Sequence, residues 1–329
     1  MHGVLRRLKF FFRHVMVWKT GFSIFPYDHT PDIASVFPEV TFDFIVCRYF
    51  KVLLYVDIYG IAPVYVDIDD SPLVLFDTVV RHQRKLSRFG SFFWRMVLRF
   101  ELWWHSLHWS GIWLADKNDI GRIGSPRKTV VLNNIPFNIF GDIASGVSDR
   151  NILCAIGGAY HQPNKQGVAK FLKEIWPAVH DRYPQLRFLI VGKGWDEVTS
   201  AQEEIPNVEY VGFVKDLKDL YSRCLACIVP IDTGAGTCIK TLEALANGRV
   251  CFATPFGARG LPGNKEELAR NGVMIYENAS EFIDLLDGLM SSCLYLNECE
   301  SAAKFFIENH YSEDAFFSHV SELLPQLKG

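Results

Sequence analysis

The sequence G-A-G-T-C-I-K-T-L-E-A-L at residues 234–245 decides the fold, because it leads from an apolar strand through a glycine turn into an amphipathic helix. The preceding run L-A-C-I-V-P-I, residues 225–231, is typical of a strand buried in a parallel sheet. Gly234 and Gly236 permit backbone conformations that other residues rarely adopt, and Thr237 is a suitable N-cap. The free N–H groups and the dipole at such a helix start favour an anion, so the stretch predicts a phosphate site.

Two charged residues of the helix extend this prediction. Lys240 lies in its first part and adds a positive charge, and Glu243 shares roughly the same face three residues later. A carboxylate at that place suits a ribose diol better than a phosphate. The same residues are also compatible with an ordinary glycine turn followed by a surface Lys–Glu pair.

Four other segments give the stretch a wider context. They are residues 152–164 (I-L-C-A-I-G-G-A-Y-H-Q-P-N), 188–194 (F-L-I-V-G-K-G), 208–214 (V-E-Y-V-G-F-V) and 253–261 (A-T-P-F-G-A-R-G-L). In this order, and together with residues 234–245, they resemble the donor-binding region of nucleotide-sugar glycosyltransferases of the GT-B architecture, in the retaining group called family 4. Five motifs in sequence are far more specific than any one of them.

The resemblance implies roles for individual residues. Lys240 would stabilise the leaving diphosphate, Glu243 would hold the ribose, and Gly212, Phe213 and Val214 would lie near the base. The residues that would surround the diphosphate are those of the glycine turns and a lysine: Gly157, Gly158, Lys193, Gly194, Gly234, Ala235, Gly236 and Thr237. The resemblance implies no metal and no cofactor beyond the donor substrate.

The chain departs from the family pattern at two positions. Many members carry a glutamate eight residues before the one that matches Glu243, where this chain has Ala235. Many also carry an arginine in the first glycine loop, which here reads G-G-A. Asp232 or Thr233 could lie near the position that the glutamate occupies in other members. Lys165 is a further candidate for contact with the diphosphate.

Alternating strands and helices predict an α/β fold with two Rossmann-like doubly wound domains. In the second half we expect a helix over residues 162–184, strands over 188–191, 208–214, 250–254 and 273–276, and helices near 216–224, 280–291, 298–309 and 313–324. Ligands of such sheets bind at the carboxyl ends of the strands, where the glycine turns fall.

The predicted domains are an N-terminal acceptor-side domain over residues 1–140, a linker over 141–150, and a C-terminal nucleotide-sugar-binding domain over 151–329. In the first half we expect strands at 42–47, 63–67, 112–115 and 129–132 and a helix over 86–108. This domain is short for the GT-B pattern, so it is either abbreviated or completed by a partner chain.

Carboxylates gather at the end of the second of these strands, in Y-V-D-I-D-D-S-P. Asp69 and Asp70 are the candidates for orienting an acceptor hydroxyl or acting as base, and Asp67 shares a strand face with Asp69. Cation binding and phosphotransfer are alternatives, as is a turn in which Asp70 and Ser71 cap the next helix.

Two segments indicate contact with a membrane surface. Residues 1–19 place Leu5, Leu8, Phe12 and Val15 at helical spacing among basic residues, as in a helix that lies in the headgroup region. Residues 89–114 hold more large aromatic side chains than one buried helix face can take: Phe92, Phe93, Trp94, Phe100, Trp103, Trp104, Trp109 and Trp113. About half of them are expected in the core against the sheet, and the others are exposed or contact a partner, a lipid carrier or the membrane interface. The longest uncharged stretch there, residues 102–115, is shorter than the roughly 20 residues of a membrane-spanning helix.

Composition sets the remaining limits. Residues 1–150 hold 18 Lys and Arg against 14 Asp and Glu, and the rest hold 16 against 23, so the first half is the one suited to an anionic surface. Nucleic acid is not an expected partner, because the sequence has no basic stripe interleaved with aromatic residues. Eight cysteines lack metal-ligand spacing, and Cys224 and Cys227 are expected to be core thiols, which fits a reducing cytoplasm.

The predicted function is therefore transfer of a sugar from a nucleotide-diphosphate sugar to a hydroxyl of a saccharide or lipid-linked saccharide, with retention of configuration. The alternative is a non-catalytic glycosyltransferase-like subunit that binds nucleotide or a partner enzyme. A nicotinamide-dependent dehydrogenase lacks support, because no G-x-G-x-x-G follows the first strand of either half.

Overall fold

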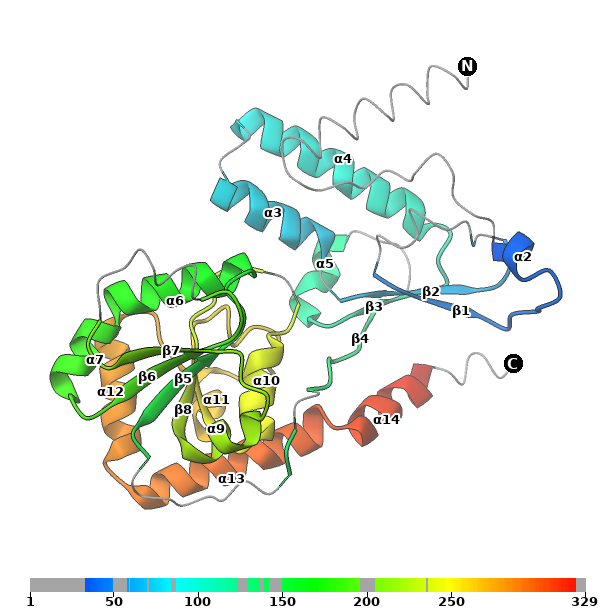
Figure 1. Ribbon diagram of the computed structural model, residues 1–329. Helices are drawn as coiled ribbons and strands as arrows, with labels where there is room; N and C mark the ends of the chain where they lie inside the picture. The colour runs from blue at the N-terminus through cyan, green and yellow to red at the C-terminus, as the bar shows by residue number, and fades with distance from the viewer. Residues whose placement is uncertain are drawn as a thin grey trace. The chain divides into compact units, whose positions relative to one another are not determined.

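A computed structural model describes residues 33–49, 58, 60–69, 71–83, 87–123, 129–136, 139–141, 150–195, 205–234 and 236–323 (Figure 1). The chain divides into two compact units. The first contains Met1–Asn133 with Gly234–Gly236 and Leu323–Gly329, and the second contains Asn134–Thr233 and Thr237–Glu322. The predicted helix over residues 1–19 and nearly all of the predicted linker lie outside the described residues.

The first unit has a four-stranded parallel sheet in chain order. Its strands are β1 (Ile45–Arg48), β2 (Val64–Ile68), β3 (Gly111–Leu114) and β4 (Thr129–Val131). All four coincide with predicted strands to within a few residues. Val64, Val66 and Ile68 of β2 are buried and alternate with half-buried residues, which is the period expected of a strand covered mainly on one face.

Helices of the first unit are α2 (Ile33–Val36), α3 (Pro72–Gln83), α4 (Arg88–Ser106) and α5 (Ile120–Ile123), with a 3-10 turn at Lys117–Asp119. Helix α4 begins where the Ser87 hydroxyl accepts a hydrogen bond from the Gly90 amide at 3.1 Å. One face of α4, with Trp94, Leu98 and Leu102, enters the core of this unit. Helix α3 is the helix that the sequence suggested only through the alternative of a cap at Asp70 and Ser71.

The second unit has a six-stranded parallel sheet in the order β10-β9-β8-β5-β6-β7. The strands are β5 (Ile152–Ile156), β6 (Arg187–Val191), β7 (Val208–Gly212), β8 (Cys224–Val229), β9 (Val250–Ala253) and β10 (Val273–Ile275). The chain winds outward from β5 in one direction and from β8 in the other. This is the doubly wound Rossmann order, and β5 and β8 form its switch point.

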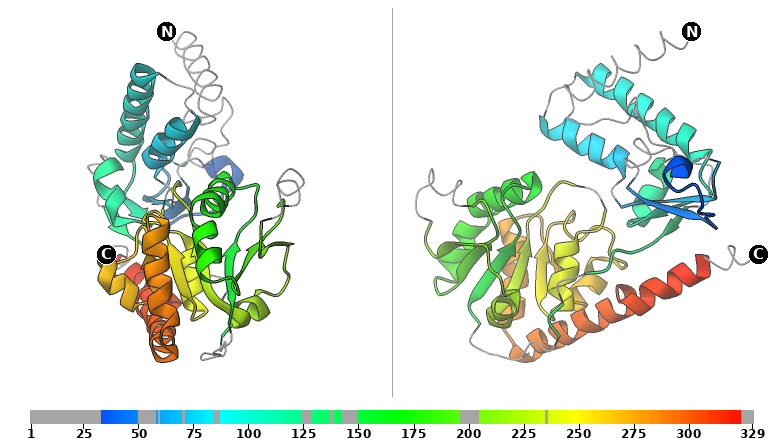
Figure 2. Two further views of the ribbon diagram at one scale, coloured as in Figure 1. Left: turned by 90° about the vertical axis from the view of Figure 1, so that its left-hand side faces the viewer. Right: turned by 45° about the vertical axis from the view of Figure 1, so that its right-hand side comes forward.

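Helices cover both faces of this sheet (Figures 1 and 2). On one face α6 (Gln162–Glu174), α7 (Trp176–Arg182) and α12 (Ala279–Met290) pack against alternate strand residues. On the other lie α9 (Leu217–Arg223), α10 (Ile239–Ala246), α11 (Lys265–Arg270) and α13 (Cys293–His310), and α14 (Glu313–Leu323) follows. The predicted α/β class with two parallel, Rossmann-like sheets is confirmed, and the doubly wound order is present in the second sheet, whereas the described strands of the first follow one another in chain order.

One predicted helix is wrong in its extent. Residues 162–184 form two helices, α6 and α7, that meet at Ile175. Pro177 lies in the first turn of α7, where its missing N–H costs nothing, but it cannot continue a preceding helix. The change of direction lets Phe171 of α6 and Trp176 of α7 both contact Phe188 of β6.

The cysteines agree with the expectation above. Cys224 and Cys227 are buried free thiols, and the Cys227 sulfur lies 3.6 Å from that of Cys154. Within the described parts of the chain, no helix combines the length and the apolar character needed to cross a membrane.

Candidate functional site

The switch point of the second unit opens a narrow crevice. Its walls come from the carboxyl ends of β5 and β8, together with Asn164, Trp195 and Lys240. The enclosed space is only about 10 Å³, room for about one water molecule. A ligand of nucleotide size would therefore lie over the loops at this edge of the sheet and not between the strands.

Backbone hydrogen bonds join the loops that follow β5, β6 and β7. The Gly157 amide donates to the Val191 carbonyl at 2.8 Å, and the Ala159 amide donates to the Lys193 carbonyl at 2.9 Å. The Gly192 amide donates to the Gly212 carbonyl at 2.7 Å. Three of the predicted glycine motifs thus form one continuous ledge at the carboxyl edge.

Gly157 is a tightly packed residue of this ledge. Its φ is 151°, and a Cβ atom there would lie 2.6 Å from Asn164 Nδ2 and 2.7 Å from Lys240 Cε. Only glycine lets the Lys240 side chain and α6 approach the main chain so closely. The structure therefore brings Gly157 and Lys240 together, although 83 positions separate them in the chain.

Two side chains that hold the ledge were missed in the sequence. The Asn164 amide donates to the Gly158 carbonyl at 2.9 Å, and the Trp195 indole donates to the Gly157 carbonyl at 2.8 Å. Both side chains are buried. The signals were present, because Asn164 ends the first quoted motif and Trp195 directly follows the glycine that ends the second.

Lys193 and Phe213 form the outer part of the ledge. The Lys193 ammonium lies 4.8 Å from the centroid of the Phe213 ring, in cation–π range, and this ring is 66% exposed. Gly212 has φ 72° and Gly194 has φ 82°, so both need glycine. Val214, next in the chain, packs partly against the core.

The start of α10 differs from the prediction. The helix begins at Ile239 with Cys238 as N-cap residue, and the Cys238 side chain makes no capping bond. Thr237 is buried and lies before the cap, so its predicted capping role is wrong. Gly234 (φ 142°) and Gly236 (φ 66°) adopt the conformations for which glycine was predicted, and Ala235 lies outside the described residues.

Glu243 lies in the middle of α10 and is only 6% exposed. The alternative of a surface Lys–Glu pair is therefore wrong for this residue, since a solvated carboxylate would be exposed. Buried glutamates are rare unless they are paired or serve a ligand.

Asp67 and Asp69 lie at the end of β2, next to Arg48 at the end of β1. The Arg48 guanidinium is 3.8 Å from Asp67 and 3.7 Å from Asp69. Burial raises the pKa of Asp67 to about 6, against the lowering effect of Arg48. Asp70 lies outside the described residues, and the Ser71 hydroxyl has no hydrogen-bond partner among those described, so Ser71 does not cap α3 through its side chain.

A metal centre finds no support in the described residues, where no group of three His, Cys, Asp or Glu side chains is placed to hold an ion.

Comparison with known proteins agrees with this geometry. Residues 150–292 match the family model of glycosyl transferases group 1. This range contains every motif of the ledge and of α10. A curated relative, an uncharacterized 44.6 kDa protein in the cps region of Klebsiella pneumoniae, is 22% identical over 177 residues, which are 50% of this chain and 44% of the relative. The predicted resemblance is confirmed for this part of the chain.

Solved structures show that the fold is of the GT-B type. TarM of S. aureus superposes with a TM-score of 0.63 at 13% identity, over 87% of this chain and 55% of TarM. Anabaena HepE, solved in complex with UDP, superposes with a TM-score of 0.58 at 14% identity, over 80% of this chain and 72% of HepE. The chain spans about half the length of the curated relative and of TarM.

Proposed function

We propose that the chain is a glycosyltransferase that moves a sugar from a nucleotide-diphosphate sugar to a hydroxyl of a saccharide or lipid-linked saccharide, with retention of configuration. The observation that carries the proposal is the contact of Lys240 with Gly157 at the switch point of a Rossmann sheet. It lies within the residues that match a glycosyltransferase family model.

The chemistry needs stabilisation of a leaving group. When the bond to the sugar breaks, negative charge grows on the distal phosphate of the nucleotide. Lys240 and the amides of residues 234–237 would stabilise that charge, as would Gly157 and Gly158 of the ledge. One preorganised donor of this kind is worth about 3 kcal/mol of barrier.

The nucleoside would occupy the outer ledge. The exposed Phe213 ring beside Lys193 offers a flat surface and a positive charge, which suit a base and a phosphate. Glu243 would accept hydrogen bonds from the ribose. Because HepE was solved with UDP, uridine nucleotides are the first donors to test.

The acceptor would lie on the N-terminal side, which we assign to residues 1–140. Asp69 and Asp70 would orient the acceptor hydroxyl. Asp67, whose pKa is raised to about 6, is closer to the working range of a general base than an ordinary aspartate.

A membrane surface is proposed as a further partner, with the chain on the cytoplasmic side. Helix α4 exposes Phe89, Phe92, Phe100 and Trp104, and Arg88 and Arg99 lie among them. Aromatic rings with interspersed arginines suit the headgroup region of anionic lipids. A lipid-linked acceptor would be reached from there.

A non-catalytic subunit remains the second candidate, because the described part of the first unit contains a sheet of only four strands against six in the second. Such a subunit would bind nucleotide or a partner chain that completes this unit. Sugar transfer or donor hydrolysis by the purified chain alone would exclude it.

The Lys240→Ala variant tests the main proposal. With UDP-sugars as donors we expect turnover to fall about 100-fold or more, while the free energy of unfolding changes by less than about 1 kcal/mol. Lys218→Ala, which removes an exposed lysine of α9, is the matched control and should keep full turnover. Full turnover in Lys240→Ala would remove Lys240 from the mechanism.

A further inference from the structure

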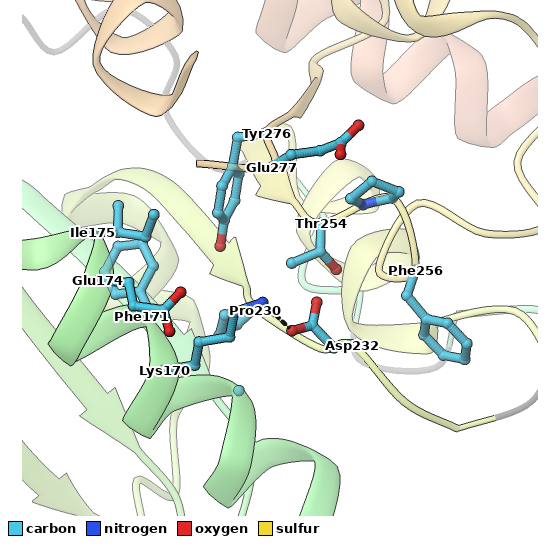
Figure 3. Close-up of a pocket in the computed structure, with 12 residues that line it drawn as sticks. Lys170, Phe171, Glu174, Ile175, Pro230, Asp232, Thr254, Phe256, Tyr276 and Glu277 are labelled. Atoms are coloured by element: carbon cyan, nitrogen blue, oxygen red, sulfur yellow. Dashed lines mark hydrogen bonds and ion pairs between the residues drawn. The ribbon is translucent and has the colours of Figure 1, made fainter. Parts of the chain in front are cut away.

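A second, larger cavity lies in the same unit, on the face covered by α6 (Figure 3). It has a volume of about 260 Å³ and is lined by α6 and by the segments that follow β8, β9 and β10. Gly167 of α6 separates it from the crevice at the switch point. A Cβ atom on Gly167 would lie 2.1 Å from the Pro230 carbonyl oxygen, so the two backbones touch there.

The cavity contains a buried hydroxyl group that lacks a partner. Tyr276 is 3% exposed, and no described residue makes a hydrogen bond with its phenol oxygen. Figure 3 shows this oxygen turned into the space between Lys170, Glu174 and Thr254. A buried polar atom without a protein partner is destabilising, so a molecule bound in the cavity would gain a hydrogen bond at this hydroxyl.

Thr254 does not meet this need. Its hydroxyl donates to the Ile231 carbonyl at 2.5 Å and accepts from the Gly257 amide at 3.0 Å. It therefore contributes its methyl group to the wall and leaves Tyr276 as the polar group at the base of the cavity.

The rim of the cavity is charged and mixed. Lys170 forms an ion pair with Asp232 at 2.6 Å, and both side chains remain partly exposed. Glu174 and Glu277 are exposed at the same rim. Three carboxylates against one ammonium disfavour an anion such as phosphate, yet together they offer both donors and acceptors.

The floor is apolar. Phe171 of α6 and Ile175, which follows α6, are buried, and Phe256 is half-buried at the edge. A pyranose ring has the matching chemistry, with an apolar C–H face and hydroxyl groups that each donate and accept. The volume is slightly below the roughly 300–1,000 Å³ of ordinary ligand pockets, so it fits one ring and not a nucleotide.

We propose that this cavity binds one neutral sugar ring, at a site separate from the candidate donor site. The Tyr276 hydroxyl bonds the buried edge of the ring, the floor packs on its apolar face, and the rim carboxylates accept from its outer hydroxyls. The site holds a sugar whether or not the chain transfers one.

Calorimetric titration of the full chain with glucose, galactose, mannose and N-acetylglucosamine tests this, with and without saturating UDP. We expect saturable binding of at least one sugar with the same affinity in both conditions. Tyr276→Phe should weaken it about tenfold, as expected for one hydrogen bond, and should leave folding intact because it removes an unpaired hydroxyl. Tyr295→Phe, a tyrosine of α13 outside the cavity, is the matched control.

The remaining outcomes overturn the proposal. Absence of saturable binding by all four sugars excludes a neutral sugar as occupant, and equal affinity in Tyr276→Phe excludes the assigned cavity. Loss of sugar binding in the presence of UDP would show that the sugar binds at the candidate donor site and not in this cavity. Because a separate titration with UDP alone measures binding at the candidate donor site, a failure here leaves the test of the donor site intact.

Discussion

At the scale of single residues, Gly157 connects local backbone geometry with ligand chemistry. Its left-handed φ and its contacts with Asn164 and Lys240 leave no room for a side chain. The sequence indicated a glycine turn here, but it could not show that Lys240 would contact it, because such a contact depends on the packing of two distant segments. Asn164 and Trp195 stand at or next to the ends of the quoted motifs, but their roles were missed because a bond from a side chain to a carbonyl leaves no periodic pattern.

The Gly157→Ala variant should therefore lose nucleotide binding and be destabilised by more than about 1 kcal/mol, because of strain at positive φ and the overlap with α6. Thermal shift with UDP and urea unfolding measure the two effects. Gly288→Ala, in α12 with open space around the new Cβ, is the control and should be neutral or slightly stabilising. If both variants behave alike, the ledge does not depend on Gly157.

Asp67 gives a prediction that depends on pH. Because burial raises its pKa from 3.8 to about 6, the folded state favours the protonated form, and this contribution to stability is lost as the pH rises through about 6. The shift corresponds to at most about 3 kcal/mol. Asp67→Asn should therefore gain stability relative to the wild type between pH 5 and pH 7.5 in urea unfolding. A difference that does not change with pH would contradict the raised pKa.

At the scale of elements, strand positions followed from short apolar runs, and helix ends were less predictable. Residues 162–184 read as one amphipathic helix because Val168, Phe171 and Ile175 recur at helical spacing, yet Pro177 begins a second helix. Helix α10 starts two residues after Thr237, at a residue whose N-cap, Cys238, makes no side-chain capping bond. Such ends are decided by packing and by backbone hydrogen bonds, which periodicity does not report.

At the same scale, helix α4 is predicted to contact the membrane surface. Of its aromatic side chains only Trp94 is buried, while Phe92, Phe100 and Trp104 are more than half exposed. Replacing these three by alanine should reduce sedimentation with vesicles of anionic lipid at least tenfold, because each removes apolar area from the interface. Phe305→Ala, which removes an exposed aromatic of α13, should leave sedimentation unchanged. Equal binding by both variants would show that α4 is not the membrane contact.

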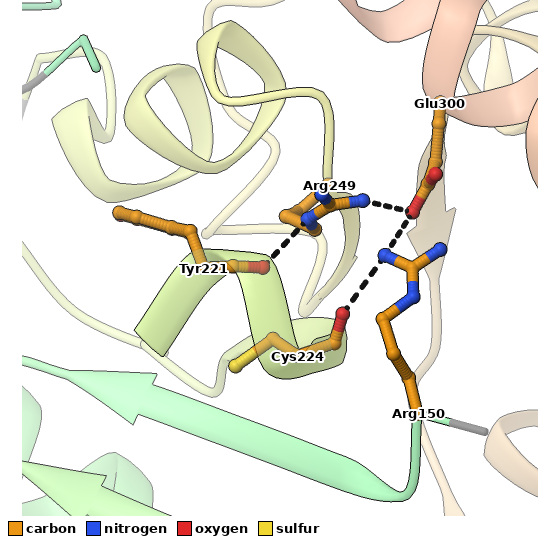
Figure 4. A network of polar contacts seen from close by, with 5 residues as sticks. All are labelled: Arg150, Tyr221, Cys224, Arg249 and Glu300. Carbon is orange, nitrogen blue, oxygen red and sulfur yellow. Dashed lines mark hydrogen bonds and ion pairs between the residues drawn. The ribbon is translucent and has the colours of Figure 1, made fainter. Parts of the chain in front are cut away.

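At the scale of the whole molecule, most of the architecture could be predicted from the sequence, because its separate patterns indicate the same fold. The alternation of strands and helices gave the parallel sheets, and the glycine motifs fall at their carboxyl edges. No sequence pattern predicted the buried ionic network around Glu300. Glu300 of α13 accepts from Arg150 at 2.6 Å and from Arg249 at 2.5 Å through one oxygen (Figure 4). The same arginines donate to the carbonyls of Cys224 and Tyr221.

This network connects α13 to the segments that begin β5, β8 and β9. It therefore links a helix late in the chain to the central strands of the sheet. Glu300→Ala should lower the free energy of unfolding by about 3–5 kcal/mol, because it leaves buried guanidinium groups without their carboxylate. Glu298→Ala, an exposed glutamate on the same helix, should change it by less than about 0.5 kcal/mol. Urea unfolding of both variants measures the difference. A small effect at Glu300 would mean that water or neighbouring carbonyls compensate both arginines, and that α13 is held by its apolar residues Ala303, Phe306 and Ile307 alone.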